Sequence, residues 1–307
     1  MKECTGKTWP LCSRCNVIMK IPKQIKHRPR VIRTIPALRA AVANFRARSA
    51  KTALIPTMGA LHEGHITLVR RANSRADRVI VSIFVNPTQF APGEDLNTYP
   101  RTFAADIAAL TELQVNLVWA PSVQTMYPDG FATRVVPEGP AKAGLEDAIR
   151  PHFFAGVATV VAKLLIQCEP DIAIFGEKDY QQLKVVTQLA RDLGLKTRIV
   201  GVPIVRERDG LALSSRNRYL TAVERQTAPM LYRVLKESAV RIANGTPVAR
   251  VLEDGRQAIT HAGLKLDYFE ARNAETLAPL TVSTRERIRL LAAIRIGTTR
   301  LIDNVAV

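Results

Sequence analysis

The chain has 307 residues, of which 47% are hydrophobic and 23% are charged. This composition is typical of a globular protein with a sizeable core, and it excludes a collagen, a long coiled coil and a largely disordered chain. The longest apolar stretch, residues 155–168, contains Lys163 and is shorter than the roughly 20 residues that span a membrane. Four cysteines are too few for a disulfide framework. We therefore expect a cytoplasmic protein with no membrane partner.

The formal net charge of +17 is unevenly distributed. Residues 1–33 contribute +8 and show no apolar periodicity, so we interpret them as a flexible basic extension. No apolar region follows their basic residues, as a secretory signal requires, and Met19 remains an alternative start of translation. The Cys-Ser-Arg-Cys pattern at Cys12 lacks regularly spaced companions for zinc. The remaining +9 suits an anionic small molecule or a nucleic-acid surface. Because Trp9 is the one aromatic residue of the extension, we expect no nucleic-acid partner there.

From residue 34 onward, short apolar runs alternate with helical periodicity. The run 79–85 is nearly continuous, which is typical of a strand buried on both faces of a parallel sheet. The alternation predicts a Rossmann-like α/β domain over residues 34–204, with helices on both faces of the sheet. The predicted elements are helix 35–48, strand 52–56, helix 64–76, strand 79–85, helix 103–113, strand 115–119, helix 157–167, strand 171–175, helix 183–193 and strand 196–205.

The alternation stops near residue 205. Two helical segments, 222–244 and 247–262, are followed by strand-like runs at 265–271, 287–296 and 299–304. Helices followed by consecutive strands predict a separate, smaller α+β domain over residues 205–307.

The most informative segment is Pro-Thr-Met-Gly-Ala-Leu-His-Glu-Gly-His, residues 56–65, which follows a predicted strand and opens a predicted helix. Free N–H groups at a helix start attract anions, and glycines let a ligand approach the backbone closely. His62 and His65 lie three residues apart on one helical face, where imidazolium groups could donate hydrogen bonds to phosphate. The spacing does not match the H-E-x-x-H zinc motif, and no P-loop is present. Structural histidines remain the alternative.

Three further segments carry polar side chains after predicted strands or near the domain boundary. Asn86 and Gln89 follow the second strand, and their amides could hold a polar substrate; a simple strand-ending turn is the alternative. Lys178 could neutralise a phosphate, and Asp179 could hold Mg²⁺; a solvated capping turn is the alternative. The segment Leu-Ser-Ser-Arg-Asn-Arg, residues 213–218, offers hydroxyl and guanidinium groups, although such loops are common. Together the segments predict an anion site suited to a triphosphate.

These segments, with Asn-Thr-Tyr-Pro-Arg-Thr at 97–102, resemble the pantoate–β-alanine ligase (pantothenate synthetase) family over residues 34–307. Residues 58–65 resemble that family's version of the HxGH motif of nucleotidylyltransferases. The resemblance implies condensation of (R)-pantoate with β-alanine, using ATP and Mg²⁺, through a pantoyl adenylate that releases diphosphate and later AMP. It also implies a homodimer and a C-terminal domain that covers the ATP site.

The resemblance assigns roles to individual residues. His65, His62 and Lys178 would be catalytic, with His65 at the position of a proton donor and His62 beside a phosphate. Gln89 and Gln182 would hold pantoate, and Asp179 would face Mg²⁺. The ATP site would comprise Met58, Gly59, Ala60, Leu61, His62, Glu63, Gly64, His65, Gly176, Glu177, Lys178, Asp179, Val205, Leu213, Ser214, Ser215 and Arg216.

One segment departs from the family pattern R-P-x-H-F-x-G-V. In this chain the usual position of the histidine is occupied by Phe153, and His152 lies one residue earlier. His152 could therefore compensate only through a local shift.

Two other functions remain open. One is a nucleotidylyltransferase with a phosphorylated acceptor, whose acceptor site should contain more cationic side chains than Gln89 and Gln182 provide. The other is a nucleic-acid-binding protein that acts through its basic extension.

Overall fold

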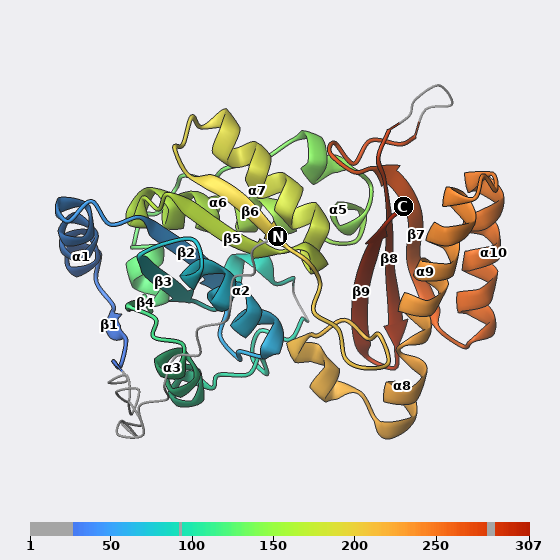
Figure 1. Ribbon diagram of the computed structural model, residues 1–307, viewed down its shortest axis with the longest axis horizontal. Helices are drawn as coiled ribbons and strands as arrows, with labels where there is room; N and C mark the ends of the chain where they lie inside the picture. Colours follow the sequence, from blue (N-terminus) through green and yellow to red (C-terminus); the bar gives the residue numbers. More distant parts are fainter. Residues whose placement is uncertain (1–26, 92–93, 281–285) are drawn as a thin grey trace, which may run out of the picture.

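The computed structural model describes residues 27–91, 94–280 and 286–307. The Cys12 pattern, Met19 and most of the predicted basic extension lie outside these residues. The larger part of the fold is a six-stranded parallel sheet with strand order β1-β4-β3-β2-β5-β6 (Figure 1). Its strands are β1 (Arg30–Ile32), β2 (Thr52–Thr57), β3 (Arg78–Ile83), β4 (Leu117–Trp119), β5 (Ile172–Gly176) and β6 (Arg198–Val202).

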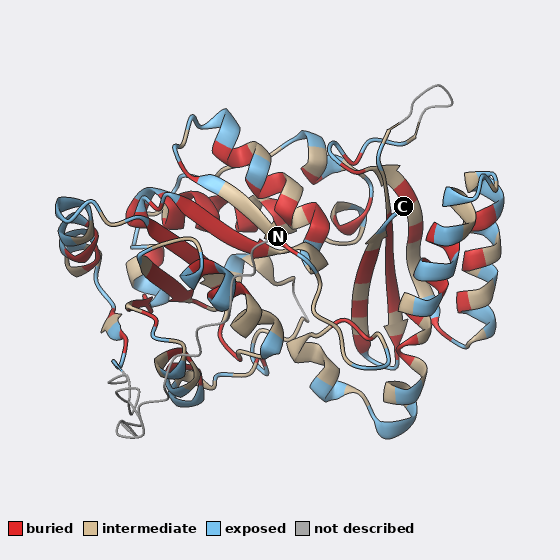
Figure 2. Cartoon of the chain, viewed as in Figure 1, coloured by how far each residue is buried: buried red, intermediate tan, exposed pale blue. Residues whose placement is uncertain are grey.

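Alternate residues of the central strands face opposite layers of helices. Leu54 and Ile80 belong to a core shared with α1 (Ile35–Ala47), α6 (Phe153–Cys168) and α7 (Tyr180–Asp192). The intervening residues Ala53, Ile55, Val79 and Val81 pack with α2 (Glu63–Asn73) and α3 (Phe103–Glu112) on the other face. Figure 2 shows the strands buried between helices whose outer faces are exposed. The predicted parallel sheet with helices on both faces is therefore confirmed.

The sheet begins earlier than the sequence indicated. β1 lies inside residues 1–33, which the sequence analysis assigned to the extension, and it pairs in parallel with β4. A three-residue edge strand is too short to show apolar periodicity, so its pattern was hidden beside the basic residues. The sheet therefore starts at Arg30, four residues before the predicted boundary.

The C-terminal part is an antiparallel sheet of β7 (Lys265–Asn273), β8 (Ile288–Ile296) and β9 (Thr299–Ala306). Helices α9 (Met230–Ala243) and α10 (Val248–His261) pack on one face of it around a separate core. The segment predicted as one helix over 222–244 is two helices, α8 (Ala222–Thr227) and α9, because Pro229 lacks an N–H and interrupts the helix.

The elements that position the site meet at the carboxyl ends of the central strands of the larger sheet. β2 continues into α2, which leads to β3 on one side, whereas β5 pairs with β2 on its other side. Such a reversal of strand order leaves a crevice at the carboxyl ends of the strands, where ligands bind in open α/β folds. The remaining short helices are α4 (Val123–Met126) and α5 (Glu146–Ile149), together with the 3₁₀ turns η1 (Pro87–Gln89), η2 (Gly139–Lys142), η3 (Glu177–Asp179) and η4 (Ser215–Tyr219). Within the described residues, every helix is too short or too polar to cross a lipid bilayer.

Candidate active site

A cavity of about 1250 Å³ opens at this crevice, between the carboxyl ends of β2 and β5 and the C-terminal domain. It brings together most of the site residues predicted from sequence: Met58, His62, Gly64, His65, Gln89, Gly176, Lys178, Asp179, Gln182, Val205, Leu213, Ser214, Ser215 and Arg216. The histidine turn and the Gly-Glu-Lys-Asp turn thus share one cavity. Five predicted residues do not line it: Gly59, Ala60, Leu61, Glu63 and Glu177.

His62 and His65 form a reciprocal cap at the start of α2. The Nδ1 atom of His62 accepts a hydrogen bond from the Gly64 N–H at 3.1 Å, and Nδ1 of His65 accepts from the His62 N–H at 3.4 Å. The ring centroids are 4.2 Å apart. Because both Nδ1 atoms accept, each neutral ring carries its proton on Nε2. The cap therefore fixes both tautomers and leaves an Nε2–H on each ring as a donor.

Both imidazoles are neutral at physiological pH. Burial, followed by the nearby positive charges of Lys178 and Arg218, lowers the pKa of His62 to about 4. Burial, followed by His62 and Lys178, lowers the pKa of His65 to about 3. The expectation of imidazolium groups is therefore wrong for the protein without ligand, because sequence spacing contains no information on desolvation. Neutral rings can still donate hydrogen bonds to phosphate, and the role of His65 as a proton donor stays a prediction.

The turn between β2 and His62 is held by a carboxylate from another helix. The buried Asp106 of α3 accepts hydrogen bonds from the N–H groups of Ala60 at 3.1 Å and Leu61 at 2.9 Å, and from the Thr102 hydroxyl at 3.1 Å. Gly59 has φ +80°, and a Cβ there would lie 3.1 Å from Asp106 Oδ2. These backbone N–H groups are already bound to a carboxylate, so they are not free to receive a phosphate.

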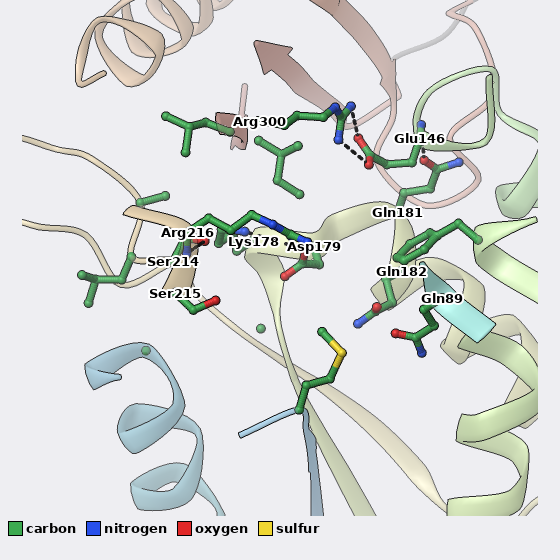
Figure 3. Close-up of a pocket in the computed structure, with 18 of the residues that line it drawn as sticks. Gln89, Glu146, Lys178, Asp179, Gln181, Gln182, Ser214, Ser215, Arg216 and Arg300 are labelled. Atoms are coloured by element: carbon green, nitrogen blue, oxygen red, sulfur yellow. Dashed lines mark hydrogen bonds and ion pairs between the residues drawn. The ribbon is translucent and has the colours of Figure 1, made fainter. Parts of the chain in front are cut away.

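Lys178 and Asp179 reach the cavity from η3, directly after β5. Their charged groups lie 3.8 Å apart, from Lys178 Nζ to Asp179 Oδ1. Figure 3 shows them beside Ser214, Ser215 and Arg216. Gln89 and Gln182 lie opposite. The cationic and hydroxyl groups thus lie on one side of the cavity and the amides on the other.

Glu177 points elsewhere. Its carboxylate accepts a hydrogen bond from Arg289 of β8 at 3.2 Å. The side chain therefore belongs to the contact between domains, and only its backbone contributes to the turn that carries Lys178.

Arg216 is engaged by a residue that sequence reasoning missed. Its Nε and Nη2 atoms donate to the two carboxylate oxygens of Asp95, at 3.2 and 3.0 Å. Ser214 accepts from the Arg216 N–H and so caps η4. The loop that was expected to hold phosphate is thus fixed to the segment after η1 in the protein without nucleotide.

Gln89 and Gln182 lie near one another at the cavity wall (Figure 3). Within the described residues, neither side-chain amide makes a hydrogen bond, so both are available to a ligand. The backbone of Gln89 is held by Arg150, whose Nη2 donates to the Gln89 carbonyl at 2.9 Å and whose Nε pairs with Glu94 at 2.8 Å. The neighbouring Gln181 is buried and fully engaged, which distinguishes it from Gln182.

The departure at His152 has a clear structural outcome. Phe153 lines the cavity, with the Arg150 guanidinium 3.9 Å from the centre of its ring. His152 is exposed and does not line the cavity. No local shift brings His152 into the position that Phe153 occupies.

A buried ion cluster joins the two domains above the glutamines. Arg300 of β9 donates two hydrogen bonds to the Glu146 carboxylate, at 2.7 and 2.8 Å (Figure 3). It donates a third to Asp267 at 2.6 Å. The Tyr268 hydroxyl donates to the same carboxylate at 2.8 Å. No local sequence signal could have found this cluster, because Glu146 and Arg300 are 154 positions apart.

The donor set for a metal is sparse. Within the described residues, no group of three or more His, Cys, Asp or Glu side chains could hold a metal ion. Asp179 is the predicted metal ligand that lines the cavity. A single carboxylate fits Mg²⁺, which binds one or two protein carboxylates and takes its other ligands from phosphates and water.

Comparison with known proteins gives one consistent result. Residues 30–306 match the family model described as pantoate-beta-alanine ligase. A pantothenate synthetase from Bradyrhizobium is 63% identical over 279 residues, which cover 91% of this chain and 99% of that protein. One from Nitrobacter hamburgensis is 62% identical over the same shares of the two chains.

Solved structures agree in fold. Pantothenate synthetase from Thermus thermophilus superposes with a TM-score of 0.84 at 47% identity, covering 90% of this chain and 98% of that one. Pantoate-beta-alanine ligase from Francisella tularensis, solved with beta-gamma ATP and beta-alanine, has a TM-score of 0.75 at 36% identity, covering 91% and 97%.

Proposed function

We propose that this protein condenses pantoate with β-alanine in the cavity described above and uses ATP to drive the reaction. The chain belongs to the pantoate-beta-alanine ligase family and is a ligase of this type. The observation that carries this proposal is the division of one cavity into a cationic, hydroxyl-rich side and a side with two free amides. A triphosphate suits the first side, and a hydroxy acid suits the second. Two substrates could therefore lie against each other in a single enclosure.

In the proposed first step, the pantoate carboxylate attacks the α-phosphorus of ATP. A P–O bond to the carboxylate forms as the P–O bond to diphosphate breaks, giving pantoyl adenylate. The substrate supplies the nucleophile, so the protein contributes orientation and stabilisation of the negative charge that builds on the phosphate oxygens. Lys178, Ser214, Ser215 and Arg216 would bind the phosphates, and His62 and His65 would donate from Nε2.

The acid side would be held by the amides of Gln89 and Gln182, which can donate to the carboxylate and hydroxyl of pantoate. In the second step, the amine of β-alanine attacks the acyl carbon, loses a proton and releases AMP. Phe153, Phe154 and Val157 provide an apolar wall beside the amides, which suits the hydrocarbon part of the acid and excludes water from the adenylate.

The role of Mg²⁺ is part of the proposal. Asp179 would hold the ion together with ATP phosphates and water, and the ion would neutralise phosphate charge. On the family resemblance, we also assign the protein to the cytoplasm and expect a homodimer. We also propose a division into a larger domain, which starts at Arg30 once β1 is included, and a C-terminal domain over residues 205–307 that covers the ATP site.

Product analysis tests the function directly. The protein is incubated with ATP, pantoate, β-alanine and Mg²⁺, and diphosphate, AMP and the amide product are quantified with each component omitted in turn. Pantoate-dependent release of diphosphate, followed by β-alanine-dependent release of AMP, is expected. Turnover of a phosphorylated acceptor without pantoate would instead favour a nucleotidylyltransferase.

A further inference from the structure

The turn that carries Lys178 and Asp179 is held by a side chain of the other domain. Asn304 of β9 is 2% exposed. Its Nδ2 donates to the backbone carbonyls of Glu177 at 3.0 Å and Lys178 at 2.9 Å. Figure 1 shows β9 as the strand of the small sheet that faces the larger domain. The backbone of the phosphate-side turn is therefore bonded to the C-terminal sheet.

The remaining atom of the same amide is also engaged. Arg289 of β8 donates from Nε to Asn304 Oδ1 at 2.7 Å and from Nη2 to the Glu177 carboxylate at 3.2 Å. Its guanidinium lies 4.2 Å from the centre of the Tyr180 ring, on the residue that follows the turn. Carbonyl oxygens only accept and a guanidinium only donates, so one orientation of the Asn304 amide satisfies all three bonds. Only a side chain with two donors and one acceptor fills this place.

Within the described residues, the side-chain hydrogen bonds to the backbone of this turn come from the C-terminal domain, and Gly176 at its start has no side chain that could cap it. The Lys178 side chain extends from the turn into the cavity. The position of its charge then depends on where the turn backbone lies, and displacements near 1 Å at a reacting centre reduce rates by about 100-fold. We propose that Asn304 is a positioning residue, which fixes the Lys178–Asp179 turn for phosphate binding only when the C-terminal sheet is docked. This proposal rests on the proposed function.

The test is a double-mutant cycle on nucleotide binding. The dissociation constant for ATP in the presence of Mg²⁺ is measured by calorimetry for the wild type, Asn304→Ala, Lys178→Ala and the double variant. We expect Asn304→Ala to raise the dissociation constant about tenfold. In the Lys178→Ala background, the same change should raise it less than about threefold, because Asn304 acts through Lys178.

A matched control weakens another contact between the domains by removing its negative charge. Glu275 pairs with Lys184 of α7 at 2.8 Å and does not touch the turn. Glu275→Gln should leave ATP binding unchanged, with thermal unfolding recorded for all variants. If Asn304→Ala does not fold, Asn304→Asp replaces it in the cycle, since it keeps the acceptor for Arg289 and loses both donated bonds.

The outcomes separate the inference from the proposed function. The positioning role is overturned if a folded Asn304 variant binds ATP as tightly as the wild type. It is also overturned if the losses of ATP affinity caused by the Asn304 and Lys178 changes multiply fully in the double variant. Diphosphate release by the wild type with ATP and pantoate is measured in parallel. Its absence would instead refute the proposed function.

Discussion

Asp95 occupies both hydrogen-bonding sites that the Arg216 guanidinium presents to it, although the two residues are 121 positions apart in the sequence. The carboxylate takes the place that a phosphate oxygen would take on the same group. Asp95 accepts from two of the five N–H donors of the guanidinium, so a nucleotide phosphate that approaches Arg216 competes with the negative charge of this carboxylate.

Replacement of Asp95 by asparagine should relieve this competition. Asp95→Asn keeps the shape but removes the charge, and we expect the dissociation constant for ATP to fall about three- to tenfold. Asp192→Asn, an exposed change of equal charge on α7, is the control. Weaker ATP binding by Asp95→Asn in calorimetry would mean that Asp95 holds Arg216 in its productive position instead.

The low pKa values of the two site histidines predict a loss of stability in acid. Burial lowers the pKa of His65 to about 3, whereas the unfolded chain protonates histidine near pH 6.5. The unfolded state then binds the extra proton between these values, so the free energy of unfolding falls as pH decreases through 6.5 towards 3. The free energy of unfolding, measured in urea, should decrease between pH 7.5 and pH 5 by about 2 kcal/mol more in the wild type than in His65→Asn. Equal decreases would contradict a His65 that is neutral in the folded protein.

Asp106 should stabilise the turn before His62. Asp106→Ala leaves the N–H groups of Ala60 and Leu61 without their acceptor, and we expect about 2–4 kcal/mol of destabilisation, measured by urea unfolding. Thr102→Val removes only the hydroxyl bond to Asp106 and should cost about 1 kcal/mol. If the two variants were equally stable, the turn would not depend on Asp106.

Loss of the Gln89 amide should weaken the use of pantoate more than the use of ATP. Its free amide lies on the acid side of the cavity, opposite Lys178 and Arg216. Gln89→Ala should raise KM for pantoate at least about tenfold, since a lost hydrogen bond leaves buried ligand groups unpaired. KM for ATP should change less than about threefold. A kinetic titration with equal effects on both substrates would argue against this assignment.

The place of Phe153 at the cavity wall can be tested by restoring the family order. The variant His152→Thr with Phe153→His places an imidazole where the ring now packs against Arg150. We expect a less tightly packed Arg150 and a higher KM for pantoate, because Arg150 holds the Gln89 carbonyl. Improved pantoate turnover would show that Phe153 costs activity.

The sequence by itself was sufficient for five of the six strands of the larger sheet, for the alternation of strands and helices, and for the meeting of the four polar segments. Apolar runs such as Val79–Ile83 identify buried parallel strands, and the carboxyl ends of parallel strands share one edge of the sheet. The sequence therefore places His62, Lys178 and Gln89 at one site. Short elements such as β1 and α5 escaped because three or four residues carry no periodicity.

The tertiary structure alone decided which groups are free and which are engaged. Asp95, Asp106 and Asn304 have no distinguishing local pattern, because their partners lie far away along the chain. The neutrality of His62 and His65 likewise depends on burial and on Lys178, which folding brings beside them. Sequence patterns report secondary structure and the burial of faces, whereas desolvation and charge at a site are set by distances in space.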